Sequence, residues 1–139
     1  MRGLIAATVT SWPSWPMTRQ PGAGSREKSL MQVVDNLSEA DAALVWVMPS
    51  TYQISAEKGM SITLNKDTGI DVAKVKSIES KVPTVLVINL VNPWVINEIE
   101  PKAAAVLATF GLKGEALLDV ISGRFNPTGK LPLTIPKDQ

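Results

Sequence analysis

Residues 123–136 read Gly-Arg-Phe-Asn-Pro-Thr-Gly-Lys-Leu-Pro-Leu-Thr-Ile-Pro. Asn126, Pro127 and Gly129 occupy the first, second and fourth positions of a four-residue turn, and these residue types favour a type I turn. Residues 131–136 then alternate between aliphatic residues and Pro or Thr, so one face of an extended segment is apolar. Because proline cannot donate to a β-ladder, this pattern predicts an edge strand at residues 131–136.

The same stretch does not have the spacing of a nucleotide-binding loop. A P-loop has four residues between its glycines, a Ser or Thr after its Lys, and a helix that follows. Here five residues separate Gly123 from Gly129, Leu131 follows Lys130, and a Pro-containing strand is expected next. The spacing therefore excludes a P-loop.

The composition is that of one globular domain, with 139 residues of which 45% are hydrophobic and 19% charged. The formal net charge is +1, and Lys and Arg are scattered among Asp and Glu, which argues against a nucleic-acid partner. No run reaches the roughly 18 apolar residues of a spanning helix, so no membrane partner is expected. Residues 1–9 lack a convincing signal-peptide cleavage site, which leaves the cytoplasm as the default compartment.

The chain contains no cysteine and no histidine. Within these residues, disulfides, thiolate chemistry, a Ser-His-Asp triad and a His-ligated zinc are therefore excluded, and neither a cofactor nor a metal site is expected. Carboxylates remain as the acid/base groups for any catalysis.

Upstream of residue 123, apolar runs of strand length alternate with helical patterns. Strands are expected at residues 4–10, 42–48, 84–90 and 103–110, and helices at residues 25–38, 71–82, 92–99 and 114–122. Asp71 can cap the second helix, and Gly123 can end the fourth. Trp94 and Phe110 border apolar runs and are expected in the core. This order predicts an α/β three-layer sandwich, in which a mainly parallel sheet has helices on both faces and a C-terminal edge strand.

Two segments are expected to be loops. Residues 11–25 contain three prolines and two glycines, which oppose regular structure. We therefore divide the chain into residues 1–25, a strand plus this Pro/Gly-rich segment, and a domain at residues 26–139. Residues 49–69 form a long polar loop after a predicted strand, and ligands of parallel sheets bind at the carboxyl ends of strands. The loop at residues 49–69 is therefore the candidate site.

The closing stretch resembles the end of the C-terminal α/β-sandwich domain of family 3 glycoside hydrolases, the β-glucosidase and β-xylosidase group. The resemblance covers residues 40–136, and upstream it rests on Pro83-Thr84-Val85-Leu86-Val87, Pro93-Trp94, Ala103-Ala104-Ala105-Val106 and Gly111. It implies hydrolysis of terminal β-glucosidic or β-xylosidic bonds with retention. Such retention needs a carboxylate nucleophile and a second carboxyl group as acid/base, about 5 Å apart.

The resemblance also implies that the catalytic pair is divided between domains. In this family the nucleophile is an Asp on a separate N-terminal barrel domain, and a barrel needs at least ~200 residues. The present 139 residues are therefore expected to be a partial C-terminal domain, completed by a barrel on another chain or in a longer parent protein. Alone, the chain is predicted not to be a complete retaining glycosidase.

The family's acid/base is a Glu near a Lys-Gly pair, on the loop after an early strand of the C-terminal domain. Here Glu57 precedes Lys58 and Gly59, which makes Glu57 the candidate acid/base. The alternative interpretation of Glu57 is a solvated Glu-Lys pair on a polar loop. Asp67, a second carboxylate of this loop, is better explained as part of a turn with Thr68 and Gly69.

Two further hypotheses belong to other functional classes. In a carbohydrate-binding or interaction module, Trp12, Trp15 and Tyr52 would contact a β-linked oligosaccharide, although a Pro-rich connector is the favoured explanation of the two tryptophans. In a truncated chain without a function of its own, exposed sheet edges would favour a homodimer or aggregation. Hydrolysis by the chain alone would need a carboxylate pair drawn from these residues: Glu57, Asp67, Glu98 and Asp119.

Overall fold

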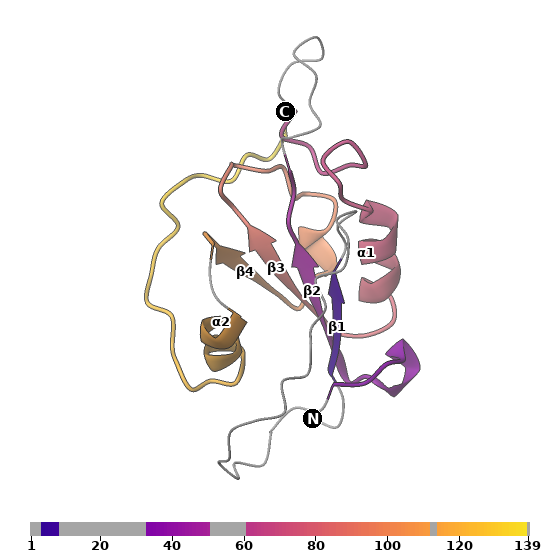
Figure 1. The fold of residues 1–139 in the computed structure, drawn as a ribbon. Coiled ribbons are helices and arrows are strands. Elements are labelled where there is room, and N and C mark those ends of the chain that lie inside the picture. The colour runs from indigo at the N-terminus through magenta and orange to yellow at the C-terminus, as the bar shows by residue number, and fades with distance from the viewer. Residues whose placement is uncertain (1–3, 9–32, 51–60, 112–113, 139) are drawn as a thin grey trace.

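The computed structural model describes residues 4–8, 33–50, 61–111 and 114–138 (Figure 1). In these residues one parallel sheet of four strands has the order β1-β2-β3-β4. The strands are β1 (Leu4–Thr8), β2 (Ala42–Val47), β3 (Thr84–Asn89) and β4 (Ala105–Thr109). Each lies within a run that the sequence predicts as a strand, so the predicted α/β fold with a parallel sheet is confirmed.

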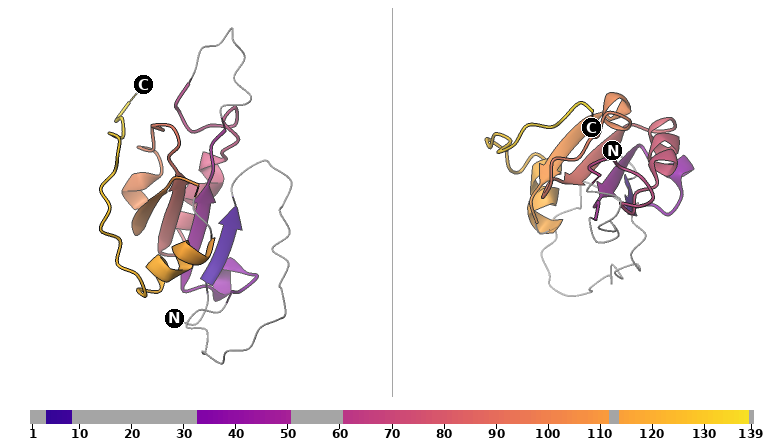
Figure 2. Two further views of the ribbon diagram at one scale, coloured as in Figure 1. Left: turned by 60° about the vertical axis from the view of Figure 1, so that its left-hand side comes forward. Right: turned by 90° about the horizontal axis from the view of Figure 1, so that it is seen from above.

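Two α-helices cover opposite faces of this sheet, as the view from above in Figure 2 shows. They are α1 (Val72–Glu79) and α2 (Gly114–Ile121). On the α1 side the fully buried strand residues are Ala43, Val45, Val47, Leu86 and Ile88. On the α2 side Ala42, Leu44 and Val87 pack with Leu117. Because both faces are covered, β2 and β3 are nearly continuous apolar runs, as expected for inner strands of a parallel sheet.

The residue predicted to cap the start of α1 and the residue predicted to end α2 both have these roles in the structure. The Asp71 side chain accepts a hydrogen bond from the Lys74 backbone N–H at 3.0 Å, which caps α1. After α2, Gly123 has a φ of +74°, a left-handed conformation that glycine adopts without steric cost. Trp94 is also placed as predicted, with 1% of its surface exposed.

The predicted helix at residues 25–38 is wrong where it can be compared. Residues 25–32 lie outside the described residues, and Val33–Asn36 are not helical. The chain forms only a 3-10 turn, η1 (Leu37–Glu39), and the Asn36 side chain donates to the Glu39 carboxylate at 3.0 Å. Asn36 has an extended backbone, with a φ of −114° and a ψ of 136°, so a helix cannot run through it.

The predicted helix at residues 92–99 is also wrong. Val95 lies opposite Thr63 in an isolated parallel bridge, and its backbone N–H donates to the Ile62 carbonyl oxygen at 2.9 Å. A single 3-10 turn, η2 (Glu100–Lys102), follows later. The long-range bond to the segment at residues 61–63 holds Val95 in an extended conformation that a helix cannot adopt.

The C-terminal edge strand and the turn before it are not observed. Residues 126–130 contain no turn, and residues 131–136 join no ladder. The Asn97 side chain donates to the Lys137 carbonyl oxygen at 3.0 Å, and Ile135 packs against the core. The segment is thus held by a side-chain hydrogen bond and by apolar packing, and not by a β-ladder. Phe110, predicted in the core, is 49% exposed, because Gly111 at a φ of +82° turns the chain away directly after it.

The division at residue 25 falls outside the described residues and stays a prediction. β1 belongs to the same sheet as β2, with Leu4 opposite Ala42 and Thr8 opposite Trp46. Among the helices in the described part of the chain, none has the length and apolar character needed to cross a membrane.

Glu79, at the end of α1, is a buried carboxylate that sequence patterns did not reveal. Both carboxylate oxygens are shielded from solvent and have no hydrogen-bond partner. Burial raises the pKa of Glu79 above its ordinary value of 4.5, and the nearby charges of Lys102 and Lys76 oppose this rise. Lys76 itself binds Glu98 in an ion pair of 2.7 Å. The ionised form of Glu79 therefore destabilises the fold.

We expect the substitution Glu79→Gln to raise the melting temperature at pH 7. Since the pKa of Glu79 is raised in the folded state, the cost is absent below pH 4.5, appears as pH rises, and is complete above the folded-state pKa. The gain should therefore shrink towards zero in melting curves recorded below pH 4.5. Asp138→Asn, at an exposed carboxylate, is the control and should show no such trend. A gain for Glu79→Gln that is independent of pH would contradict the assignment.

Candidate functional site

The carboxyl ends of β2, β3 and β4 meet at one edge of the sheet. Met48 follows β2, Leu90 follows β3, and Phe110 follows β4. The Leu90 backbone N–H donates to the Thr109 carbonyl oxygen at 2.8 Å, so the ladder continues to this edge. Ligands of parallel sheets bind at this end because the connecting loops converge there.

The loop after β2 has both of its ends fixed at this edge. The Ser50 backbone N–H donates to the Thr68 carbonyl oxygen at 3.0 Å, which joins the entry of the loop to its exit. The exit closes in a turn in which Ile70 N–H donates to the Asn65 carbonyl oxygen at 2.8 Å, with Gly69 at a φ of +78°. The described residues on either side of residues 51–60 are therefore joined near the carboxyl end of β2.

The structure places some of the predicted site residues and not others. Trp12, Trp15, Tyr52 and Glu57 lie outside the described residues, so their roles stay predictions. Asp67 is exposed within the turn at residues 66–69, in agreement with its structural interpretation.

Two further carboxylates make ion pairs on opposite faces of the sheet. Glu98 binds Lys76 of α1 at 2.7 Å, whereas Asp119 of α2 binds Arg124 at 3.0 Å. A retaining pair needs its carboxylates about 5 Å apart. A catalytic pair made of Glu98 and Asp119 is therefore wrong, since α1 and α2 lie on different faces.

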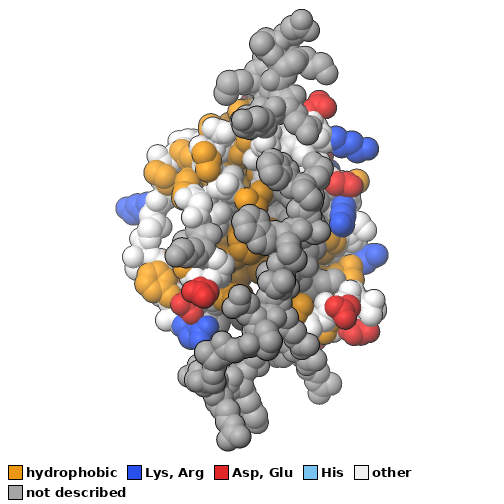
Figure 3. Space-filling model, in the orientation of Figure 1, with side chains coloured by type: hydrophobic (Ala, Val, Ile, Leu, Met, Phe, Trp, Pro, Cys, Tyr) orange, Lys and Arg blue, Asp and Glu red, His pale blue; other side chains and the backbone are white. Residues whose placement is uncertain are grey.

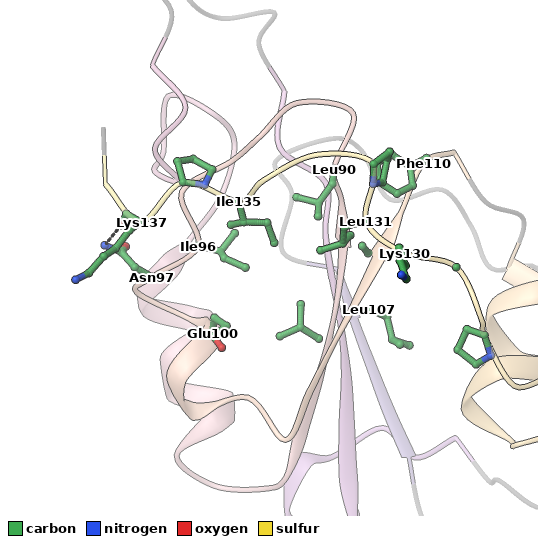
Figure 4. Close-up of a pocket in the computed structure, with 16 residues that line it drawn as sticks. Leu90, Ile96, Asn97, Glu100, Leu107, Phe110, Lys130, Leu131, Ile135 and Lys137 are labelled. Carbon is green, nitrogen blue, oxygen red and sulfur yellow. Dashed lines mark hydrogen bonds between the residues drawn. The ribbon is translucent and has the colours of Figure 1, made fainter.

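An apolar cavity of about 890 Å³ lies beside β4, between the strand and the C-terminal segment (Figure 4). In Figure 4, Leu131 and Ile135 of that segment face Leu90 and Ile96 across the cavity. Further aliphatic and aromatic lining comes from Val106, Leu107, Ala108 and Phe110. The polar side chains that contribute to the lining are Asn97, Glu100, Lys130 and Lys137.

The chemistry of this cavity suits an apolar group better than a sugar. A sugar ring needs several hydrogen-bonding groups around it, whereas most of this lining cannot form hydrogen bonds. The Asn97 amide is already engaged with the Lys137 carbonyl oxygen, and this bond crosses one end of the cavity. The cavity is therefore distinct in character from a glycoside-binding site.

Sequence patterns missed this cavity for identifiable reasons. Phe110 ends an apolar run, and this pattern predicts a core residue. The glycine that follows it, Gly111, indicates that the chain can turn there. The hydrogen bond from Asn97 to Lys137 joins residues 40 positions apart, and no local sequence pattern predicts it. Within the described ranges, no group of three or more Asp or Glu residues is arranged to hold a metal ion.

Comparison with known proteins identifies relatives that are much longer than this chain. β-Glucosidase C of Emericella nidulans is 37% identical over 111 residues, which cover 76% of this chain and 17% of that protein. A probable β-glucosidase C of Aspergillus flavus is 38% identical over 110 residues, covering 75% of this chain and 17% of that protein. A probable β-glucosidase C of Aspergillus oryzae is 37% identical over 110 residues. The chain thus spans about a sixth of the length of the curated relatives it matches.

The comparison with protein families covers nearly the whole chain. The model described as the glycosyl hydrolase family 3 C-terminal domain matches residues 4–139, which include β1, both helices and the segment after α2. This match agrees with the parallel sheet and with the resemblance of the closing stretch. The chain belongs to the family of glycosyl hydrolase family 3 C-terminal domains.

Proposed function

We propose that this domain completes the active site of a β-glycosidase that removes terminal β-linked glucose or xylose. In this proposal the domain supplies Glu57 as acid/base from the loop after β2. The nucleophile comes from a barrel domain, on another chain or elsewhere in a longer parent protein. The observation that supports the proposal is the bond between Ser50 and Thr68, which joins described residues before and after Glu57 in the sequence near the carboxyl end of β2.

The chemistry assigned to Glu57 has two stages. Glu57 first donates a proton to the glycosidic oxygen while the barrel carboxylate attacks the anomeric carbon, and a covalent glycosyl-enzyme forms. Glu57 then accepts a proton from the water that hydrolyses this intermediate. Both stages need the Glu57 carboxyl group to stay about 5 Å from the nucleophile, so the loop must be held firmly at its ends.

Thr68 stabilises the turn at residues 65–70, where this loop ends. It is 1% exposed, and its hydroxyl oxygen accepts from the Asn65 backbone N–H at 2.9 Å. The same hydroxyl lies 2.9 Å from the Asn65 carbonyl oxygen, to which it can donate. The Asn65 side-chain oxygen in turn accepts from the Thr68 backbone N–H at 3.0 Å. These reciprocal bonds close the turn. They thereby position the Thr68 carbonyl oxygen, which accepts from the Ser50 backbone N–H.

We expect Thr68→Val to lower the free energy of unfolding by about 1–3 kcal/mol, since it removes the acceptor of the half-buried Asn65 backbone N–H without a change of shape. Thr134→Val, at an exposed threonine, is the matched control and should change it by less than about 0.5 kcal/mol. Urea unfolding of both variants measures the difference. Equal effects for the two variants would contradict the role of Thr68.

The role of Glu57 is tested by reconstitution. The chain is combined with the remainder of β-glucosidase C of Emericella nidulans, expressed without the 111 residues that align with this chain. We expect hydrolysis of aryl β-glucosides to need both parts. Glu57→Gln should lower the rate about 10²–10⁴-fold, and the loss should be larger for alkyl than for dinitrophenyl glucosides, because poor leaving groups need the proton most.

Asp67→Asn is the control, because it removes another loop carboxylate that lies in the exposed turn. It should leave the rate and its dependence on the leaving group unchanged. An unchanged rate for Glu57→Gln would discard this residue as the acid/base. Hydrolysis by the chain alone that Glu57→Gln abolishes would show that the second carboxylate also lies in these 139 residues.

A further inference from the structure

The triplet Asn36-Leu37-Ser38 has the sequence required for N-linked glycosylation, in which Asn is followed by a residue other than Pro and then by Ser or Thr. A second triplet, Asn126-Pro127-Thr128, begins and ends in the same way. Its middle residue is Pro, which excludes modification there. Asn36 is therefore the one asparagine of the 139 residues that meets the sequence requirement.

The fold exposes both functional side chains of the first triplet. Asn36 is the residue at which the turn η1 begins, and its carbonyl oxygen accepts from the Glu39 backbone N–H at 3.1 Å. Leu37 is partly buried and packs against the core cluster on the α1 side of the sheet. Asn36 and Ser38, on either side of Leu37, are both exposed. The middle residue thus holds the turn on the domain, while the amide and the hydroxyl group remain accessible.

The conformation of Asn36 is compatible with a large attached group. Its backbone is extended, so its side chain does not lie along a helix. The side-chain nitrogen carries two hydrogens, and it donates to the Glu39 carboxylate at 3.0 Å. A sugar bound to this nitrogen replaces one hydrogen and leaves the other. The hydrogen bond to Glu39 can therefore remain after modification.

Asn36 lies at the end of the sheet opposite to the candidate site. η1 comes shortly before Ala42, the first residue of β2, and the neighbouring strands run parallel to β2. In Figure 1, η1 is the short purple turn at the lower right, whereas the strands point upward. Figure 3, in the same orientation, shows acidic side chains at the surface there. A group attached to Asn36 would therefore not obstruct the carboxyl edge of the sheet.

We propose that Asn36 is the acceptor of an N-linked oligosaccharide. The donor belongs to the class of oligosaccharides that a pyrophosphate joins to a lipid. The Asn36 side-chain nitrogen forms a bond to the anomeric carbon of the first sugar and loses one proton. The bond from that carbon to the pyrophosphate oxygen breaks, and the lipid pyrophosphate leaves with the electron pair. The product carries a bulky, solubilising group at the amino end of the sheet.

Translation of the full chain in the presence of microsomes tests this assignment. Entry into the microsomal lumen is a property of the whole parent protein, so a cleavable leader is added to the chain. We expect chains in the lumen to carry one glycan, seen as a mobility shift that an endoglycosidase removes. Asn36→Gln and Ser38→Ala should each lose this shift. Ser38→Thr should keep it, because Thr also completes the required triplet.

Pro127→Ala is the matched control, because it removes the Pro that excludes modification of the exposed Asn126. This variant should carry a second glycan. Only chains that an added protease cannot digest are scored, since these chains have entered the lumen. An unmodified parent chain in this fraction would overturn the proposal, whether or not Pro127→Ala is modified. A shift that persists in Asn36→Gln would also overturn it, since another residue would then carry the glycan.

Urea unfolding tests whether the folded domain accommodates the glycan. The chain with the same leader is secreted by a eukaryotic host, purified, and treated with an endoglycosidase that leaves one sugar on Asn36. Because Asn36 is exposed, the unfolding midpoint should be the same before and after treatment. A midpoint that rises when the glycan is removed would overturn the proposal, because the folded turn would then resist modification.

Discussion

The pairing of β2 with β3 is the contact on which the rest of the domain depends. Val45 and Val47 of β2 and Leu86, Val87 and Ile88 of β3 are each 0% exposed, with neighbours on both faces of the sheet. A one-residue shift in register would move each of these side chains to the other face, where it would have to pack against a different set of neighbours. The register of this pair thus fixes where β2 and β3 end relative to each other, and the β3–β4 register adds the end of β4.

That edge combines two kinds of chemistry. The loop after β2 is polar in sequence, and the bond from the Ser50 backbone N–H to the Thr68 carbonyl oxygen joins its two described parts. The cavity beside β4 has a mostly apolar lining, which suits an apolar group better than a sugar.

The sequence predicted elements whose signals are local. The four strands are continuous apolar runs, Asp71 caps α1, and Gly123 follows α2 with a positive φ. Prediction from the sequence failed where contacts between residues distant in the chain decide the conformation. Val95 is held by Ile62, and the C-terminal segment is held by Asn97, so a predicted helix and a predicted edge strand do not form. Of the candidate site, the position of the loop was predictable from the end of β2. The buried Glu79 and the exposed Phe110 were not, because burial depends on neighbours distant in the sequence.

Hydrogen–deuterium exchange of the isolated chain tests the central role of the β2–β3 pair most directly. If this pair holds the domain together, amides of Ala43–Val47 and Val85–Ile88 exchange only when the whole domain unfolds. We expect their exchange to be slower by a factor on the order of 10² or more than that of residues 131–135, which join no ladder. Similar exchange rates in the two regions would contradict the account, since the carboxyl edge would then have no rigid support.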